Sequence, residues 1–217
     1  MNESIMLPFN GARNLSTRLL VIVASTRPGR LGLPIANWAV SEIEKYGGFE
    51  VDVADLALMD LPMLDEPHHP HHRTYTKPHT IAWSKRVDAA DAILIITPEY
   101  NYGMPGSLKN AFDFLFHEWN YKPVAFVSYG GVSAGTRAAQ QLAQVASELK
   151  MVPVRDEVNL SLIGLAVDAR GCPTGELYMK KAEALLSELC FWAELLKAGR
   201  ERHPPLSSAV RTEPARV

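Results

Sequence analysis

The stretch from residue 92 to residue 115 reads AILIITPEYNYGMPGSLKNAFDFL. It opens with an apolar run rich in isoleucine, which is typical of a strand buried on both faces. It ends with apolar residues at helical spacing, so a polar and aromatic cluster lies where a strand gives way to a helix. In an open parallel sheet, ligands bind outside the carboxyl ends of the strands. The cluster therefore predicts a ligand site at that edge of a sheet.

Strand and helix patterns alternate along the rest of the chain. Apolar or alternating runs predict strands at 19–24, 49–56, 91–96, 123–129 and 152–162, with helices at 35–46, 83–90, 105–119, 133–150 and 174–197. Five such units predict an α/β fold, a three-layer sandwich with helices on both faces of a five-stranded parallel sheet. Their length favours the flavodoxin-like strand order 2-1-3-4-5, whose switch point lies between the first and third strands.

The length of 217 residues fits one domain with two tails. Residues 1–16 show no sustained period and are predicted to form a flexible arm. Residues 17–198 carry the strand and helix pattern and are predicted to form the domain. From residue 199 the chain is rich in Pro, Arg and Ser, so residues 199–217 are predicted to be a disordered tail.

Composition and charge exclude several classes of protein. The formal net charge is −2, from 22 basic and 24 acidic side chains, which does not favour nucleic acid or an anionic membrane surface as a partner. The early apolar run at 19–24 is too short to insert in a membrane. The two cysteines, Cys172 and Cys190, have no metal-binding spacing and indicate reduced thiols. The predicted location is cytoplasmic.

A first turn with the sequence STRPGR follows the first predicted strand. Helix amino termini bind anions through unpaired backbone N–H groups, hydroxyls add donors, and arginine suits phosphate. The turn matches neither the dinucleotide-binding nor the nucleotide-hydrolysing glycine pattern. The candidate phosphate ligands are Ser25, Thr26, Arg27 and Arg30. A plain connecting turn with two solvated arginines is the alternative interpretation.

Two further turns follow the third and fourth predicted strands. The second turn supplies a rigid proline, two aromatic rings and polar groups that suit a flat ligand: Pro98, Glu99, Tyr100, Asn101 and Tyr102. The third turn contains glycines that expose backbone N–H groups able to stabilise negative charge on a flavin edge: Ser128, Tyr129, Gly130 and Gly131. Each turn alone is also compatible with an ordinary loop. Together the three turns predict a site for flavin mononucleotide (FMN).

These motifs closely resemble the NADPH-dependent FMN reductase family, over about residues 18–150. The family uses the flavodoxin-like fold and includes quinone, azo-dye and chromate reductases. The resemblance implies that the first turn holds the FMN phosphate, the second contacts the ribityl chain and isoalloxazine, and the third covers the pyrimidine edge. It also implies a homodimer or homotetramer. The sequence departs from the usual family pattern at Ala24 and Ala134, where glycine is common.

The predicted function is an FMN-dependent NAD(P)H oxidoreductase that passes hydride from the nicotinamide through FMN to a small-molecule electron acceptor. Quinones, azo compounds, metal oxyanions and free flavin all fit an open site. No acid or base side chain is assigned to catalysis, because hydride transfer requires none. The alternatives are a flavodoxin-type electron carrier and a redox-sensing flavoprotein. NADH and NADPH remain equally compatible with the sequence.

Residues 66–73 read EPHHPHHR and invite a metal interpretation, since imidazole binds zinc, copper and nickel. Proline-interrupted pairs on a loop do not supply a rigid tetrahedral arrangement, however. We therefore predict no metal site and interpret the segment as a mobile, solvated loop. A long loop of this kind can also shape the entrance to a substrate site.

Overall fold

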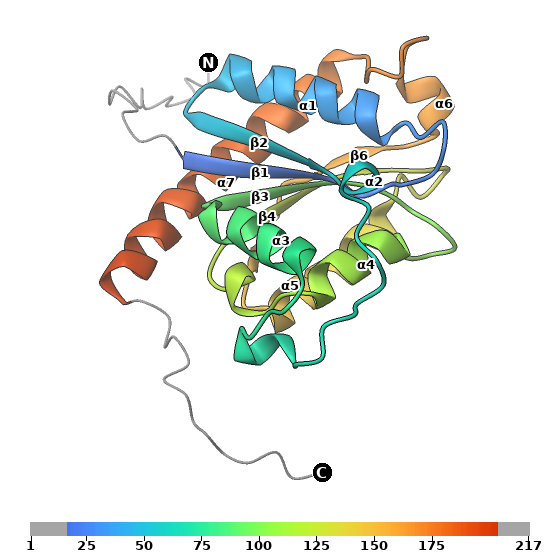
Figure 1. The fold of residues 1–217 in the computed structure, drawn as a ribbon. Helices are drawn as coiled ribbons and strands as arrows, with labels where there is room; N and C mark the ends of the chain where they lie inside the picture. The colour runs from blue at the N-terminus through green and yellow to red at the C-terminus, as the bar shows by residue number, and fades with distance from the viewer. Residues whose placement is uncertain (1–16, 204–217) are drawn as a thin grey trace.

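A computed structural model describes residues 17–203, and its centre is a parallel sheet. The order of the strands is β2-β1-β3-β4-β5, with β6 also paired to β4. Figure 1 shows the strands running side by side, with their carboxyl ends gathered at one edge. The strands are β1 Thr17–Val23, β2 Phe49–Asp55, β3 Ala92–Pro98, β4 Pro123–Tyr129, β5 Val152–Pro153 and β6 Val158–Leu160.

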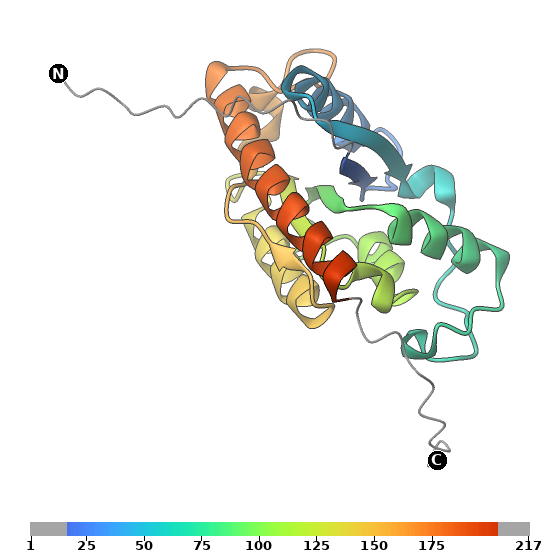
Figure 2. The same cartoon turned by 90° about the vertical axis from the view of Figure 1, so that its left-hand side faces the viewer.

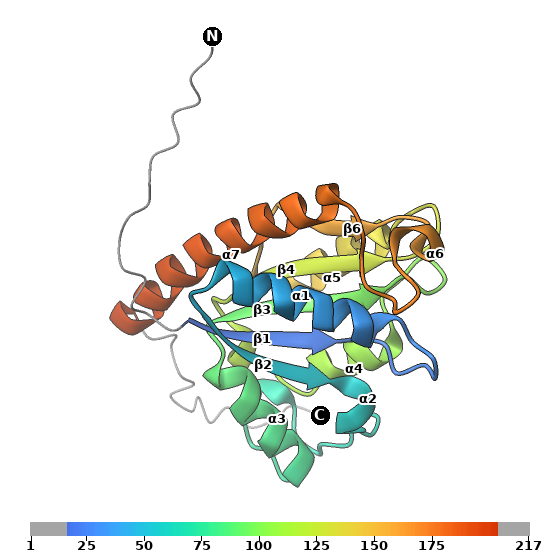
Figure 3. The same ribbon diagram turned by 90° about the horizontal axis from the view of Figure 1, so that it is seen from above.

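Helices cover both faces of the sheet, as Figure 3 shows from above. One apolar core joins the sheet to α1 and α7, and a second joins its other face to α3, α4 and α5. In Figure 2 the long helix α7 crosses the molecule from end to end. The helices are α1 Gly32–Tyr46, α2 Leu56–Met59, α3 Pro78–Ala89, α4 Gly106–Asp113, α5 Thr136–Glu148, α6 Ile163–Ala166 and α7 Glu176–Arg202, with short turns η1 Pro70–His72 and η2 His117–Trp119.

The central strands β3 and β4 are buried along their whole length, as their continuous apolar sequences predict. The edge strand β2 alternates between exposed and partly buried residues before ending in buried Ala54 and Asp55. This difference confirms the predicted order, because only a central strand is covered on both faces by helices and flanked by strands on both sides.

The predicted fifth strand is divided in two. β5 pairs with the start of β4, and β6 pairs with its end, so both occupy the place expected for 152–162. The Val152 and Val154 N–H groups donate to the Lys122 and Val124 carbonyls, and the chain then leaves β4 until Val158. The predicted helix over 105–119 is also divided, into α4 and η2. α5 begins at Thr136 rather than at residue 133, because Ala134 and Gly135 have positive φ angles that a helix does not allow.

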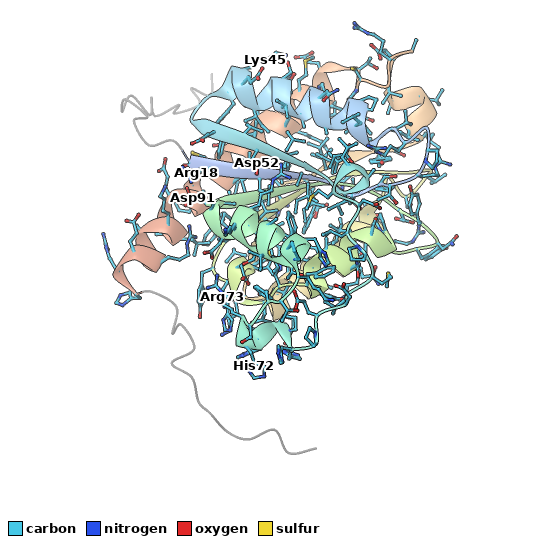
Figure 4. The ribbon with its side chains drawn as sticks, in the orientation of Figure 1. Arg18, Lys45, Asp52, His72, Arg73 and Asp91 are labelled. Atoms are coloured by element: carbon cyan, nitrogen blue, oxygen red, sulfur yellow. The ribbon has the colours of Figure 1, made fainter. Side chains whose placement is uncertain are left out.

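A cluster of charged groups closes the edge of the sheet opposite the carboxyl ends. Asp91 accepts hydrogen bonds from the Arg18 N–H at 3.1 Å, the Lys197 ammonium at 2.8 Å and the Arg200 guanidinium at 3.1 Å. Arg18 and Asp91 lie together at this end of the molecule in Figure 4. These contacts hold α7 in helical form to Arg202, four residues into the predicted tail. The predicted arm 1–16 and residues 204–217 lie outside the described residues.

The histidine-rich segment is tied to the helices by hydrogen bonds. Glu66 accepts from the Thr76 and Lys77 N–H groups, and the fully buried Glu118 accepts from Tyr75 and Ser84. His72 and Arg73 lie at the bottom of Figure 4, on the short turn η1 and directly after it. Among residues 17–203, no three His, Cys, Asp or Glu side chains are placed to hold a metal ion.

Candidate flavin site

The first turn leaves β1 and returns the chain into α1. The Arg30 N–H donates to the Arg27 carbonyl at 3.1 Å, which closes a four-residue turn. Pro28 and Gly29 occupy its two central positions, and Gly29 has a φ of 68°. Proline favours the second position of such a turn, and glycine readily adopts the positive φ that its third position requires. The sequence therefore specifies the path of the backbone around the predicted phosphate site.

The amino terminus of α1 faces this turn without a side-chain cap. Leu31 precedes the helix and supplies no capping hydrogen bond, and the first turn of the helix contains no acidic residue. The first N–H groups of a helix have no partner within the helix and carry a partial positive charge. They are therefore available to bind an anion beside this turn.

The two predicted arginine ligands lie in different surroundings. Arg27 is exposed on the turn. Arg30 is directed toward Asp55 at the end of β2 and forms an ion pair with it, with side chains 18% and 5% exposed. The Nε atom of Arg30 is buried and has no hydrogen-bond partner. Arg27 is therefore the more available cation, while Arg30 is held in place by a carboxylate that the sequence analysis missed.

Three hydroxyl groups gather beneath the first turn. The Ser25 Oγ lies 2.7 Å from the Tyr100 Oη. The Tyr129 Oη is buried without a hydrogen-bond partner, and a Cβ atom on Gly32 would lie 3.0 Å from it. Burial and the neighbouring Tyr100 raise the pKa of Tyr129, so this hydroxyl keeps its proton. Tyr129 was predicted to cover the pyrimidine edge, but its hydroxyl lies at the first turn.

The second turn is a tight hairpin. The Tyr100 and Gly103 backbones exchange two hydrogen bonds of 3.0 Å, and the two residues between them, Asn101 and Tyr102, have φ angles of 48° and 71°. Positive φ at both central residues matches the twist of a two-residue hairpin. The Met104 N–H donates to Gln141 Oε1 at 2.8 Å, which attaches the hairpin to α5. Tyr102 is 73% exposed at the tip of this hairpin.

The third turn follows β4. Gly131 is exposed, and a Cβ atom there would meet nothing within 4 Å, so its backbone faces open space. Gly130 is less available, because its N–H donates to the Leu160 carbonyl at 3.3 Å. The Ser128 side chain is buried and donates to the Ala134 carbonyl at 2.8 Å. Ser128 therefore supports the turn from inside and does not offer its hydroxyl to the surface.

Strand pairing brings the three turns together. Val23 at the end of β1 is opposite Ile96 in β3, and Pro98 at the end of β3 is opposite Tyr129 at the end of β4. The predicted residues of all three turns therefore lie at one edge of the sheet, on the right-hand side of Figure 1. Glu99 is the exception within the second turn, since its carboxylate is directed toward Ser133 and Arg137 on the third turn and α5.

A cavity of about 410 Å³ adjoins the first turn. Its walls come from the first turn, α2, the segment after α2 and the start of α4. Asn110 braces this wall, because its side chain accepts from the Leu64 N–H at 2.9 Å and donates to the Pro62 carbonyl at 2.7 Å. The lining residues are Thr26, Leu56, Ala57, Asp60, Leu61, Met63, Ser107 and Asn110.

The chemistry of the site fits FMN. An uncapped helix terminus and an exposed arginine suit its phosphate, and buried polar atoms of Arg30 and Tyr129 have no partner within the protein. The hairpin supplies an aromatic wall for a flat ring, and Gly131 leaves room for close approach. This sheet order and the three converging turns define a flavodoxin-like mononucleotide-binding protein.

Comparison with known proteins identifies the family. The sequence pattern of NADPH-dependent FMN reductases matches residues 17–163, so the chain belongs to the NADPH-dependent FMN reductase family. It is an oxidoreductase, with FMN as cofactor and NAD(P)H as co-substrate. An NAD(P)H-dependent FMN reductase of Schizosaccharomyces pombe is 42% identical over 139 residues, covering 63% of this chain and 69% of the relative.

Two further relatives extend the comparison. An NAD(P)H:quinone oxidoreductase of Solanum tuberosum is 33% identical over 129 residues, covering 57% of this chain and 64% of the relative. FerB of Paracoccus denitrificans, a flavoenzyme NAD(P)H:(acceptor) oxidoreductase, superimposes with a TM-score of 0.66 at 23% identity, covering 82% of this chain and 98% of its own. The superposition on FerB confirms the predicted flavodoxin-like fold. Within residues 17–203, no helix combines the length and apolar character needed to cross a membrane.

Proposed function

We propose that the protein transfers electrons from NAD(P)H, through FMN, to a quinone. The convergence of three turns around unpartnered buried polar atoms is the observation that carries this proposal. The relative from Solanum tuberosum is named as a quinone oxidoreductase, which supports this acceptor over azo compounds and metal oxyanions. The exposed Tyr102 ring at the mouth of the site suits a flat aromatic or quinonoid molecule.

Each turn has a distinct task in binding. Ser25, Thr26, Arg27 and the amino terminus of α1 hold the phosphate, with Arg30 positioned beside them by Asp55. The hairpin that contains Tyr100, Asn101 and Tyr102 would line the isoalloxazine, and Gly131 would face its pyrimidine edge. When bound, FMN would supply the hydride chemistry that links the nicotinamide to the acceptor.

The protein contributes position and electrostatics, and none of its side chains is assigned as an acid or a base. The Tyr129 hydroxyl keeps its proton because burial raises its pKa, so it can act as a hydrogen-bond donor but not as a base. The Tyr100 hydroxyl is shared with Ser25. Tyr100 therefore joins the first two turns, while the Tyr129 hydroxyl remains available as a donor.

The proposed assembly is a homodimer or homotetramer in the cytoplasm. Leu58 and Met63 are 81% and 79% exposed near the cavity that adjoins the first turn, and exposed apolar side chains of this kind favour self-association. Two cysteines in 217 residues fit a reducing compartment. The net charge of −2 favours small molecules, and not nucleic acid, as partners.

Titration and steady-state kinetics test the proposal. Purified protein is stripped of flavin, titrated with FMN, and then assayed for NADH and NADPH oxidation with and without benzoquinone. We expect one FMN per chain and oxidation that depends on the quinone. Stoichiometric FMN binding without turnover of either nucleotide would instead indicate an electron carrier or a redox sensor. A protein that cannot be reconstituted with FMN contradicts the assignment altogether.

A further inference from the structure

Glu99 connects the second turn to the third turn and α5. Its Oε1 atom accepts from the Ser133 hydroxyl at 2.9 Å and from the Arg137 Nη1 at 2.9 Å. Its Oε2 atom accepts from the Arg137 backbone N–H at 3.1 Å. The side chain is only 8% exposed. Both carboxylate oxygens are thus engaged by the turn that follows β4, although Glu99 belongs to the turn that follows β3.

The charge of Glu99 is stabilised in this position. Burial by itself raises the pKa of the carboxyl group, but the hydrogen bonds from Arg137 and Ser133 lower it below its ordinary value. The carboxylate is therefore ionised at neutral pH. Hydrogen bonds to a charged group are stronger than neutral ones, and removing one partner of a buried charged pair leaves the other uncompensated.

Arg137 extends the same contact to the tip of the hairpin. The central carbon of its guanidinium lies 4.0 Å from the centroid of the Tyr102 ring. Since Arg137 stands in the first turn of α5, one side chain reaches both Glu99 and Tyr102. A guanidinium is suited to both contacts, because its flat face stacks on an aromatic ring while its N–H groups donate to a carboxylate.

The segments held in this way have strained backbones. Asn101, Tyr102 and Ala134 have φ angles of 48°, 71° and 55°. Conformations of this kind are uncommon for residues other than glycine and persist when the surroundings hold them in place. The third turn is also closely packed, because a Cβ atom on Gly135 would lie 2.7 Å from the Tyr129 nitrogen. The contact of Glu99 with Ser133 and Arg137 helps to hold both turns in these conformations.

We propose that Glu99 is a positioning residue for the flavin site, which fixes the spacing of the second and third turns through Ser133 and Arg137. This inference rests on the proposed function, because it concerns the two turns assigned to the isoalloxazine and its pyrimidine edge. The Glu99 carboxylate acts through Ser133 and Arg137, to which both of its oxygens are bonded. Its loss lets the turns separate, so the site is no longer formed in advance and FMN binds more weakly.

Titration of the flavin-free protein with FMN, followed by flavin fluorescence, tests this role. Glu99→Ala is expected to raise the Kd for FMN about 10-fold or more, as does loss of a charge-assisted hydrogen bond. Arg137→Ala is expected to do the same. The double variant Glu99→Ala/Arg137→Ala is expected to bind no more weakly than either single variant, because the two side chains act as one unit. Glu99→Gln keeps an acceptor for Ser133 and is expected to recover part of the affinity.

Glu118→Gln is the matched control. Glu118 is another buried carboxylate with several hydrogen bonds, but it lies before the start of β4, at the opposite edge of the sheet. It is expected to lower the midpoint of thermal unfolding and to leave the Kd for FMN unchanged. The visible circular dichroism of bound FMN supplies a second readout, since it reports the surroundings of the ring, and it is expected to change in the Glu99 variants only.

Three outcomes in the variants, and one in the unaltered protein, would overturn the proposal. An unchanged Kd and dichroism in Glu99→Ala, while the unaltered protein binds FMN, removes the positioning role and leaves the proposed function intact. Losses that add fully in the double variant show that Glu99 and Arg137 act separately. An equal loss of affinity in Glu118→Gln shows that general destabilisation is the cause. If Glu99→Ala does not fold, Glu99→Gln and Arg137→Ala carry the same test. Failure of the unaltered protein to bind FMN contradicts both this inference and the proposed function.

Discussion

The Ser25 hydroxyl lies 2.7 Å from the Tyr100 hydroxyl, so a single hydrogen bond joins two turns that are 75 residues apart in the sequence. Ser25 belongs to the predicted phosphate site and Tyr100 to the predicted isoalloxazine wall. The Ser25 hydroxyl can accept from Tyr100 while it donates to a phosphate, so this contact is compatible with an occupied phosphate site. It joins the predicted phosphate site directly to the predicted isoalloxazine wall.

Tyr100→Phe tests this connection. The substitution keeps the ring and removes the hydroxyl, so the free energy of unfolding is expected to fall by about 0.5–1.5 kcal/mol. In a double-mutant cycle with Ser25→Ala, the two losses are expected not to add, because both variants remove the same hydrogen bond. Chemical denaturation of the flavin-free proteins measures the effect. Fully additive losses would show that the two hydroxyls contribute independently.

The two arginines of the first turn are expected to respond differently to substitution. Arg27→Ala removes an exposed cation, so it is expected to weaken FMN binding about 10–100-fold, equivalent to about 1.5–3 kcal/mol. The stability of the flavin-free protein is expected to stay the same. Fluorescence titration and thermal unfolding measure the two quantities. Unchanged FMN affinity in this variant would place the phosphate elsewhere.

Arg30→Ala is expected to destabilise the flavin-free protein. Asp55, whose side chain is 5% exposed, would lose its cationic partner and remain buried. Breaking a buried ion pair in this way costs about 3–5 kcal/mol. The expected result is a clear fall in the midpoint of urea denaturation before any flavin is added. Equal stability of Arg30→Ala and Arg27→Ala would mean that the pair with Asp55 contributes little.

Glycine substitutions in the third turn separate backbone strain from open space. Gly135→Ala is expected to be strongly destabilising, because Gly135 has a φ of 80° and the added Cβ would lie 2.7 Å from the Tyr129 nitrogen. Overpacking of this kind costs about 1–3 kcal/mol. Gly131→Ala meets nothing within 4 Å and is expected to change the unfolding free energy little. Denaturation curves of the two variants compare them directly, and equal effects would contradict the described turn.

The burial of Lys122 leads us to expect that the free energy of unfolding rises with pH. Its ammonium is buried and donates to the Val87 and Asp88 carbonyls at the end of α3. Desolvation lowers the pKa of Lys122 to about 7 from its ordinary 10.5, so the unfolded chain binds the proton more tightly than the folded chain does. Stability should therefore rise as the pH increases from about 7 towards 10.

Lys122→Met is the matching variant, since it retains an unbranched side chain without the titrating group. Denaturation at pH 7 and pH 9.5 is expected to show a gain in unfolding free energy for the unaltered protein and a smaller gain for the variant. Loss of the two hydrogen bonds lowers the stability of the variant at both pH values, so the slope, and not the absolute value, is compared. Identical slopes would show that Lys122 does not titrate in this range.

The sequence was sufficient to predict the sheet and the meeting of the three turns. Hydrophobic runs located β1, β3 and β4 to within two residues at each end, and the Pro-Gly pair at 28–29 marked a turn. Division of the last strand after Val154 and the late start of α5 were missed. The first depends on which residues pair with β4, and the second depends on the positive φ angles of Ala134 and Gly135. The periodicity of apolar residues contains neither kind of information.

The roles of individual site residues were harder to predict, because side-chain direction depends on neighbours from distant segments. Glu99 was expected to face the ligand but is engaged by Arg137, and Ser128 was expected near the pyrimidine edge but is buried beneath Ala134. Asp55, which holds Arg30, follows an edge strand with no distinguishing motif. The adjacency of the first two turns, by contrast, followed from the predicted strand order, which places β1 beside β3.

The ion-paired end of α7 around Asp91 lies across the sheet from the flavin site (Figure 4). Substitutions there act on the cohesion of the fold and leave the reacting groups untouched. Such substitutions can therefore change the resistance of the protein to proteases, and hence its abundance in the cell, without changing its catalytic rate. For engineering, this offers a place to extend the working life of the catalyst without retuning its chemistry.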